Sequence, residues 1–219
     1  MSEMLQKNLA NLHAFWRAMT VISSENEIFS HPSWPNKIWH TDFIKINSNQ
    51  WRDHIHVTLA EPLPRDKVTI KAQLTAMYLA LENAKGVTHQ QIVLVQSLKE
   101  LQQWSSACGQ AFGYEINTHS LVPLLDDENA TIVAFQVNGK MAGTAILYQS
   151  NNNMGIHQVG VLPNFQGRGI GKALMLHLVT LSKQKACKSM TLQASQDGIA
   201  MYRNMGFTPL SSLYHLEKK

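Results

Sequence analysis

The sequence has few cysteines and no long apolar segment. Its 219 residues include two cysteines, Cys108 and Cys187, which stand far apart and form no CxxC pair. That usage is typical of reduced thiols in a reducing compartment. The N-terminus has no apolar signal-peptide core, and no stretch reaches the ~20 apolar residues of a membrane span. We therefore expect a soluble, cytoplasmic protein that does not insert into a membrane.

Charge is also sparse and unclustered. Charged residues make up 16 % of the chain, and 19 Lys and Arg against 15 Asp and Glu give a formal charge of +4. Apart from Lys218 and Lys219 the basic residues form no run, so the sequence predicts no nucleic-acid partner. The histidines, including His54 and His56, lack metal-ligand spacing, and we expect no metal site. Hydrophobic residues, at 44 %, are sufficient for a globular core.

The first part of the chain contains helical and strand patterns. Apolar residues at helical spacing predict a helix from Leu5 to Met19. Residues 33–39 predict a turn followed by a strand, and 53–59 a strand stopped by Pro62 and Pro64. Residues 67–85 predict a second helix, with Gly86 as its C′ residue. The polar segment that follows predicts a domain boundary, giving residues 1–88 and 89–219.

The second part predicts a mixed, mostly antiparallel sheet with flanking helices. Asn138-Gly139 is a strong hairpin signal between two strands. The order is strand, helix, antiparallel meander, helix, strand, helix, strand, which is an α+β fold. The predicted strands are 92–95, 131–137, 141–148, 156–162, 189–194 and 211–216, and the helices are 98–112, 170–185 and 199–205. The first of these helices is expected to direct Leu98, Leu101, Trp104, Ala107 and Cys108 inward.

A glycine-rich loop joins a strand to a helix at residues 159–175. Glycines at 167, 169 and 171 leave backbone N–H groups uncovered, and the first helical turn adds further unpaired N–H groups. Together they can hold a phosphate or pyrophosphate. The loop is neither a Walker loop, since Ala173 follows Gly171-Lys172, nor a GxGxxG dinucleotide fingerprint. A purely structural turn with close helix packing is the alternative.

Two motifs resemble the GNAT superfamily of N-acetyltransferases. The first is Q/R-x-x-G-x-G/A, present as Gln166-Gly-Arg-Gly169-Ile-Gly171, and the second is Leu192 to Phe207, a strand and short helix ending Tyr-x-x-x-Gly-Phe. They occur in the family's order and spacing, and the resemblance covers roughly residues 90–219. Residues 1–88 resemble the degenerate partial copy of the fold that some members carry. A family-specific extension is the alternative for this region.

The resemblance implies that acetyl-CoA is bound as co-substrate. It implies contacts from the strand Val159, Gly160 and Val161, from the loop and helix start, and from Ser195 and Tyr202 beyond. Many members have Asn where this chain has Ser195, so any role of that Asn is in doubt. The loop and helix-start residues are Gln166, Gly167, Arg168, Gly169, Ile170, Gly171 and Lys172. Arg168 is expected to add positive charge near a phosphate, and the alternative is that its side chain is simply solvated in the loop.

The resemblance also suggests the catalytic groups. Tyr202 matches the family tyrosine that protonates the departing thiolate; a half-buried structural aromatic is the alternative. His157, two residues before Val159, is expected on the same strand face and is the candidate base. A plain strand histidine is the alternative there.

The implied activity is acetyl transfer to a primary amine by direct attack in a ternary complex. A non-catalytic acyl-CoA sensor and a protein Nα-acetyltransferase are the alternatives. The loops at 113–130, with Asp126, Asp127 and Glu128, are candidates for the acceptor site, although an acidic triplet before a strand is usually a solvated turn. The acceptor is not specified by the sequence, and a homodimer through sheet edges is compatible with it.

Overall fold

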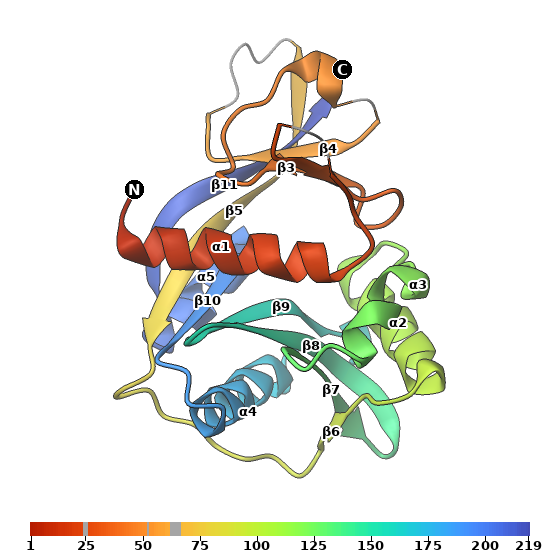
Figure 1. Cartoon of the computed structure of the whole chain (residues 1–219). Helices are drawn as coiled ribbons and strands as arrows, with labels where there is room; N and C mark the ends of the chain where they lie inside the picture. Colours follow the sequence, from red (N-terminus) through yellow and green to blue (C-terminus); the bar gives the residue numbers. More distant parts are fainter. Residues whose placement is uncertain (24–25, 52, 62–66) are drawn as a thin grey trace. The chain divides into compact units, whose positions relative to one another are not determined.

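A computed structural model describes residues 1–23, 26–51, 53–61 and 67–219 (Figure 1). These residues form two compact units. One unit contains residues 1–78 and 192–219, and the other contains residues 79–191. Strand β10 (Ser189–Ala194) begins in the second unit and ends in the first. The domain boundary expected between residues 88 and 89 stays a prediction, because the two compact units are defined by packing contacts and not by domain limits.

The described residues of the first unit contain part of a larger sheet, with the strand order β1-β2-β3-β4-β11-β5. Neighbouring strands are antiparallel except β3 and β4, which run parallel. The elements of this unit besides β10 are α1 (Glu3–Ala18), β1 (Ile22–Ser23), β2 (Ile28–Ser30), β3 (Lys37–His40), the 3-10 turn Ser48–Gln50, β4 (Ile55–Thr58), β5 (Val68–Ala80), the 3-10 turn Gln196–Gly198, α5 (Ile199–Asn204) and β11 (Thr208–Lys218). Helix α1, the strand at 37–40 and the strand at 55–58 confirm the sequence-based predictions.

Helix α1 is fixed to the first unit by a buried amide. The side chain of Asn8, fully buried, donates from Nδ2 to the carbonyls of Met77 and Leu192, both at 2.9 Å. Its Oδ1 accepts from Gln193 Nε2 at 2.7 Å. The helix also packs Trp16 edge-on against Trp39, with ring centroids 4.9 Å apart.

The predicted helix at 67–85 is wrong, because this segment is the long strand β5. It pairs with β11 from Tyr78 opposite Thr208 to Val68 opposite Lys218. Gly86 is therefore no helix cap. A Cβ there would lie 2.9 Å from the backbone nitrogen of Thr180, so the glycine allows the chain to pass close to helix α4 (Ile170–Gln184). Pro62 and Pro64, expected to stop the preceding strand, lie outside the described residues.

The second unit is an antiparallel sheet in the order β9-β8-β7-β6. Its elements are β6 (Ile92–Leu94), α2 (Leu98–Phe112), α3 (Thr118–Leu121), the 3-10 turn Val122–Leu125, β7 (Ala130–Val137), β8 (Lys140–Ser150), β9 (Asn153–Val161), the 3-10 turn Pro163–Phe165 and α4 (Ile170–Gln184). The predicted meander is confirmed. Asn138 and Gly139, at φ 51° and 74°, form the hairpin turn.

Helices α2 and α4 cover opposite faces of this second sheet. A Cβ on Gly160 would approach Ala111 and Phe112 of α2, and one on Gly143 would approach Ile170 and Leu174 of α4. Gly160 lies opposite Thr144 and Gly143 opposite Val161, so the two glycines face different sides. The fold is thus α+β, with both faces of the glycine-loop strand covered by helices.

The predicted inward face of α2 is mostly confirmed. Trp104 is fully buried and donates from Nε1 to the carbonyl of Val133 at 2.8 Å, which ties the helix to β7. Leu101, Ala107 and Cys108 are buried, but Leu98 is 49 % exposed, so its predicted inward position is wrong. The reason is local: Leu98 is the first residue after the N-cap Ser97, ahead of the turns that contact the sheet.

Candidate functional site

The glycine loop leaves an open surface between β9 and α4. Gly167 and Gly169 adopt φ of 73° and 77°, the left-handed region in which side chains are disfavoured. A Cβ at either position would meet nothing within 4 Å. These glycines are therefore required by the backbone conformation and not by internal packing, and the space above them is clear for a ligand.

The amides at the start of α4 are available to an anion. Gly169 is the N-cap residue, and no side chain caps the helix there. The first intrahelical bond runs from Ala173 N to Gly169 O at 2.9 Å. Within the described residues, the N–H groups of 169–172 donate no hydrogen bond. Unpaired amides at the positive end of a 15-residue helix are suited to binding phosphate.

Side chains of the loop are fixed by neighbouring groups. Gln166 donates from Nε2 to the carbonyl of Val161 at 3.1 Å, which links the loop to the end of β9. The exposed Arg168 guanidinium lies 5.4 Å from the centre of the Phe165 ring. Ile170 is buried and anchors the first turn, whereas Lys172 is exposed. The loop thus presents backbone amides with two cationic side chains at its surface.

Strand β9 contains a bulge that was not predicted from the sequence. Ile146 pairs with His157 and Thr144 with Gly160, so one strand carries an extra residue, and Gln158 adopts φ 52°. The bulge places His157 on the same face as Gly160. The prediction that His157 shares a face with Val159 is wrong, because it assumed an unbroken alternation.

Gln158 is held at this bulge from several sides. Its carbonyl accepts from Thr144 Oγ1 at 3.1 Å, and its Oε1 accepts from Cys108 Sγ at 3.6 Å. Its side chain is also hydrogen-bonded to Tyr114. Burial raises the pKa of Cys108 to about 12, so this thiol is a hydrogen-bond donor and no nucleophile at neutral pH. The available signal for the bulge was Gly160, since glycine inside a strand often marks one.

His157 is buried, with 7 % of its surface exposed. Burial lowers the pKa of its imidazole to about 3. A neutral imidazole with so low a pKa is a weak base, which favours the plain strand histidine left open by the sequence.

Tyr202 belongs to the first unit and is grouped there with Ser195 and Gly198. A Cβ on Gly198 would lie 3.0 Å from Tyr202 Cε2 and 3.5 Å from Ser195 Oγ, so glycine leaves room for the ring. The Tyr202 ring meets Phe207 edge-on at 5.7 Å. Burial raises the pKa of Tyr202 to about 12, which keeps the phenol protonated at neutral pH. Ser195 is exposed.

The acidic residues 126–128, which were candidates for the acceptor site, lie in the turn before β7. Asp127 Oδ1 accepts a hydrogen bond from the backbone N–H of Asn129 at 2.9 Å, which is typical of the solvated turn that was the alternative interpretation. Among the described residues, no group of three or more His, Cys, Asp or Glu side chains is placed to hold a metal ion. In the same part of the chain, no helix has both the length and the apolar character needed to span a membrane.

A strand, an open glycine loop and an uncapped helix within an α+β fold form a site for a ligand that carries a phosphate group. The chain belongs to the acetyltransferase (GNAT) family, whose model matches residues 97–207.

The names of the curated relatives refer to different acceptor molecules. The chain is 31 % identical over 87 residues to the streptothricin acetyltransferase of Streptomyces lavendulae, covering 37 % of this chain and 46 % of that protein. It is 30 % identical over 83 residues to the glucosamine 6-phosphate N-acetyltransferase of Trypanosoma brucei brucei, covering 35 % and 56 %. The [ribosomal protein bS18]-alanine N-acetyltransferase of Escherichia coli K12 is 30 % identical over 73 residues, covering 32 % and 49 %. The chain thus spans about half the length of these relatives.

A solved structure extends the likeness to the whole chain. A GCN5-related N-acetyltransferase from Kribbella flavida superposes with a TM-score of 0.67 at 14 % identity, covering 100 % of this chain and 96 % of that one. At this identity the likeness shows the fold alone. It includes residues 1–88, in agreement with a GNAT-like N-terminal region.

Proposed function

We propose that this protein is an acetyl-CoA-dependent N-acetyltransferase that acts on a primary amine. The observation that carries the proposal is the open loop at 166–169 followed by the unpaired amides of 169–172. In this proposal those amides bind the pyrophosphate of coenzyme A, and Arg168 and Lys172 add positive charge. The backbone of Val159, Gly160 and Val161 pairs with the pantetheine arm.

In the proposed reaction the amine attacks the thioester carbonyl directly. The carbon–sulfur bond then breaks, the thiolate leaves and takes a proton, and the ammonium formed on nitrogen loses one. Tyr202 is the proposed proton donor to the thiolate, and its protonated state at neutral pH supports this role. For the base, burial argues against His157, and a water-mediated route to solvent is compatible with the same chemistry.

The proposal is tested first by ligand-dependent melting of the whole protein. Acetyl-CoA at 100-fold over its Kd stabilises the bound protein by about 2.7 kcal/mol, which corresponds to a few degrees in Tm. Gly171→Glu puts a carboxylate among the amides and should abolish that shift. Gln184→Glu, an exposed residue at the other end of α4, adds the same charge and should keep it.

Two alternatives are separated by further outcomes. A Tm shift without thiol release across a panel of amines would favour a non-catalytic acyl-CoA sensor. Acetylation of peptides but not of small amines would favour a protein Nα-acetyltransferase, a reading supported by the name of the bS18-alanine relative. If wild-type protein shows no shift, the proposed coenzyme A site is wrong. The expected cytoplasmic location and a homodimer remain predictions.

A further inference from the structure

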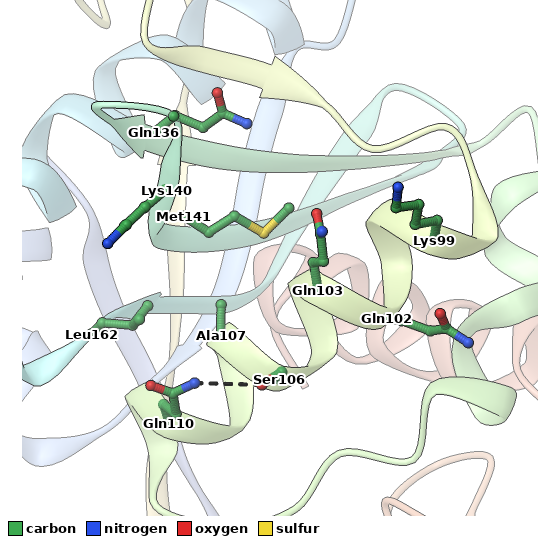
Figure 2. A pocket seen from close by; sticks show the side chains of 11 residues that line it. Lys99, Gln102, Gln103, Ser106, Ala107, Gln110, Gln136, Lys140, Met141 and Leu162 are labelled. Carbon is green, nitrogen blue, oxygen red and sulfur yellow. Dashed lines mark hydrogen bonds between the residues drawn. The ribbon is translucent and has the colours of Figure 1, made fainter.

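A groove runs between α2 and the β7–β8 hairpin in the second unit (Figure 2). Its volume is about 690 Å³, and none of the residues assigned above to coenzyme A or to catalysis lines it. The lining consists of Lys99, Gln102, Gln103, Ser106, Ala107, Gln110, Gln136, Gly139, Lys140, Met141 and Leu162. Figure 2 shows Gln103 pointing from α2 toward Met141 on the hairpin.

The groove carries positive charge without a counter-charge. Lys99 and Lys140 line it, and none of the described residues of the lining is acidic. In the ranges that the structure describes, neither ammonium forms an ion pair. The neighbouring Glu100 is already engaged, because its Oε2 accepts from the backbone N–H groups of Gln96 at 2.9 Å and Ser97 at 3.0 Å. An acidic ligand would therefore meet two unneutralised cations.

The remaining polar groups of the lining match a peptide. Four glutamine side chains (Gln102, Gln103, Gln110, Gln136) carry one carbonyl acceptor and two N–H donors each, the groups that a peptide backbone pairs with. One N–H of Gln110 already donates from Nε2 to Ser106 Oγ at 3.4 Å (Figure 2). The floor supplies apolar contact from Ala107, Met141 and Leu162. No aromatic side chain lines the groove, which disfavours single-stranded nucleic acid, whose bases stack on aromatic rings.

The length of the groove also suits an extended segment. From Lys99 to Gln110 the helix rises by roughly 16 Å at 1.5 Å per residue, which equals about five residues of extended chain at 3.3 Å each. A small phosphorylated molecule would use only one end of such a site, whereas an extended peptide would reach both lysines.

We propose that this groove binds an extended acidic segment of a partner protein. The segment lies along α2, its carboxylates pair with Lys99 and Lys140, and its backbone is hydrogen-bonded by the glutamine side chains. At the C-terminal end of α2, Ala111 and Phe112 cover Gly160 next to the β9 bulge. The proposal does not depend on whether the glycine loop binds coenzyme A.

The test is fluorescence anisotropy with the full chain and a labelled ten-residue peptide that alternates Asp with Ser and Val. We expect saturable binding that weakens with added salt, and about tenfold weaker binding for the Lys99→Gln/Lys140→Gln variant. Gln103→Glu, nearly isosteric and exposed, should weaken binding similarly by placing a carboxylate in the groove. The same peptide with Asn in place of Asp should not bind.

The matched control is Lys183→Gln/Lys188→Gln, which removes the same charge from exposed positions of the same unit. It should bind the acidic peptide as the wild type does. Equal weakening by the control pair would mean attraction to net charge only and would overturn the groove as the site. Unchanged binding in both Lys99→Gln/Lys140→Gln and Gln103→Glu, or no binding by wild type, would overturn it as well.

Discussion

Single residues in this protein have roles that depend on their backbone conformation. Gly167 and Gly169 were identifiable from sequence, because a strand–glycine loop–helix pattern implies uncovered amides. The position of the bulge at Gln158 was not, because Gly160 indicates only that a bulge can occur nearby, and an inserted residue leaves the polar and apolar pattern of the strand unchanged. The left-handed φ of Gln158 follows from the pairing of β9 with β8, a tertiary property.

The proton donor can be tested at Tyr202. Tyr202→Phe removes only the hydroxyl, so we expect kcat to fall by about 10²–10⁴ while the Kd for acetyl-CoA changes little. Steady-state thiol release and calorimetric titration measure the two quantities. Tyr214→Phe in β11 is the control and should keep the wild-type rate. A Tyr202→Phe enzyme with wild-type kcat would assign the thiolate proton to another group.

Backbone strain can be tested at Gln158. Gln158→Ala and Gln158→Gly both remove the side-chain contacts with Cys108 and Tyr114, and both should destabilise the protein by roughly 1–2 kcal/mol through those lost bonds. Glycine alone relieves the positive φ, so the Gly variant should be about 1 kcal/mol more stable than the Ala variant. Urea unfolding gives both values. An Ala variant as stable as the Gly variant would show that φ 52° is not strained here.

Helices and strands could be predicted from sequence where residues at both of their ends favour starting and stopping the element. Helix α2 spans Leu98–Phe112, as expected, because Ser97 and Glu100 form a capping box and Gly113 terminates it at φ 76°. Strand β5 was missed because Leu74, Met77, Tyr78 and Leu81 imitate a helical stripe. The alternation of Val68, Ile70, Ala72 and Leu74 was also present, and the long partner β11 decides in its favour.

The attachment of α1 can be tested at Asn8. Asn8→Leu removes both donors and the acceptor and leaves the carbonyls of Met77 and Leu192 unpaired in the interior, so we expect a loss of about 2–4 kcal/mol. The free energy of unfolding from urea titration measures it. Gln6→Leu on the exposed side of the same helix should change stability by less than about 0.5 kcal/mol. Similar losses for both variants would remove Asn8 from its anchoring role.

At the scale of the whole molecule, the sequence predicted the α+β class and the family fold, but not how the chain is divided into compact units. Residues 192–219 pack with residues 1–78 because β11 pairs with both β4 and β5. The local sequence does not indicate which strands pair when they are so distant in the chain, because each strand shows only the usual alternation of polar and apolar residues.

Acid stability follows from histidines that are buried without charge. Burial lowers the pKa of His31 and of His56 to about 4, from an unfolded value near 6.5. Since the unfolded state binds more protons, the stabilisation is complete above pH ~6.5 and is lost as the pH falls toward 4. Each such histidine should contribute a slope of up to about 1.4 kcal/mol per pH unit in that window.

Urea unfolding between pH 7 and 4 measures this dependence. His56→Phe keeps a ring against Trp51, whose centroid lies 4.6 Å from that of His56, and removes one titrating group. Between pH 6.5 and 4, its free energy of unfolding should change less steeply with pH than that of the wild type. The expected difference in slope is up to about 1.4 kcal/mol per pH unit, the contribution of one histidine. An unchanged slope would mean that His56 is protonated without cost in the folded protein.

The pairing of β11 between β4 and β5 also orders the events of biosynthesis. When the ribosome has finished residue 194, every strand and helix that the structure describes in the second unit has been made, β10 included. The first unit then still lacks β11, the strand that pairs with both β4 and β5. Helix α1 is translated before two partners of Asn8, Leu192 and Gln193, which follow it by 184 and 185 residues. A nascent chain therefore carries an incomplete first unit until β11 has been translated. A premature stop before residue 208 would remove the strand that pairs with both β4 and β5, and it would remove no residue of the second unit.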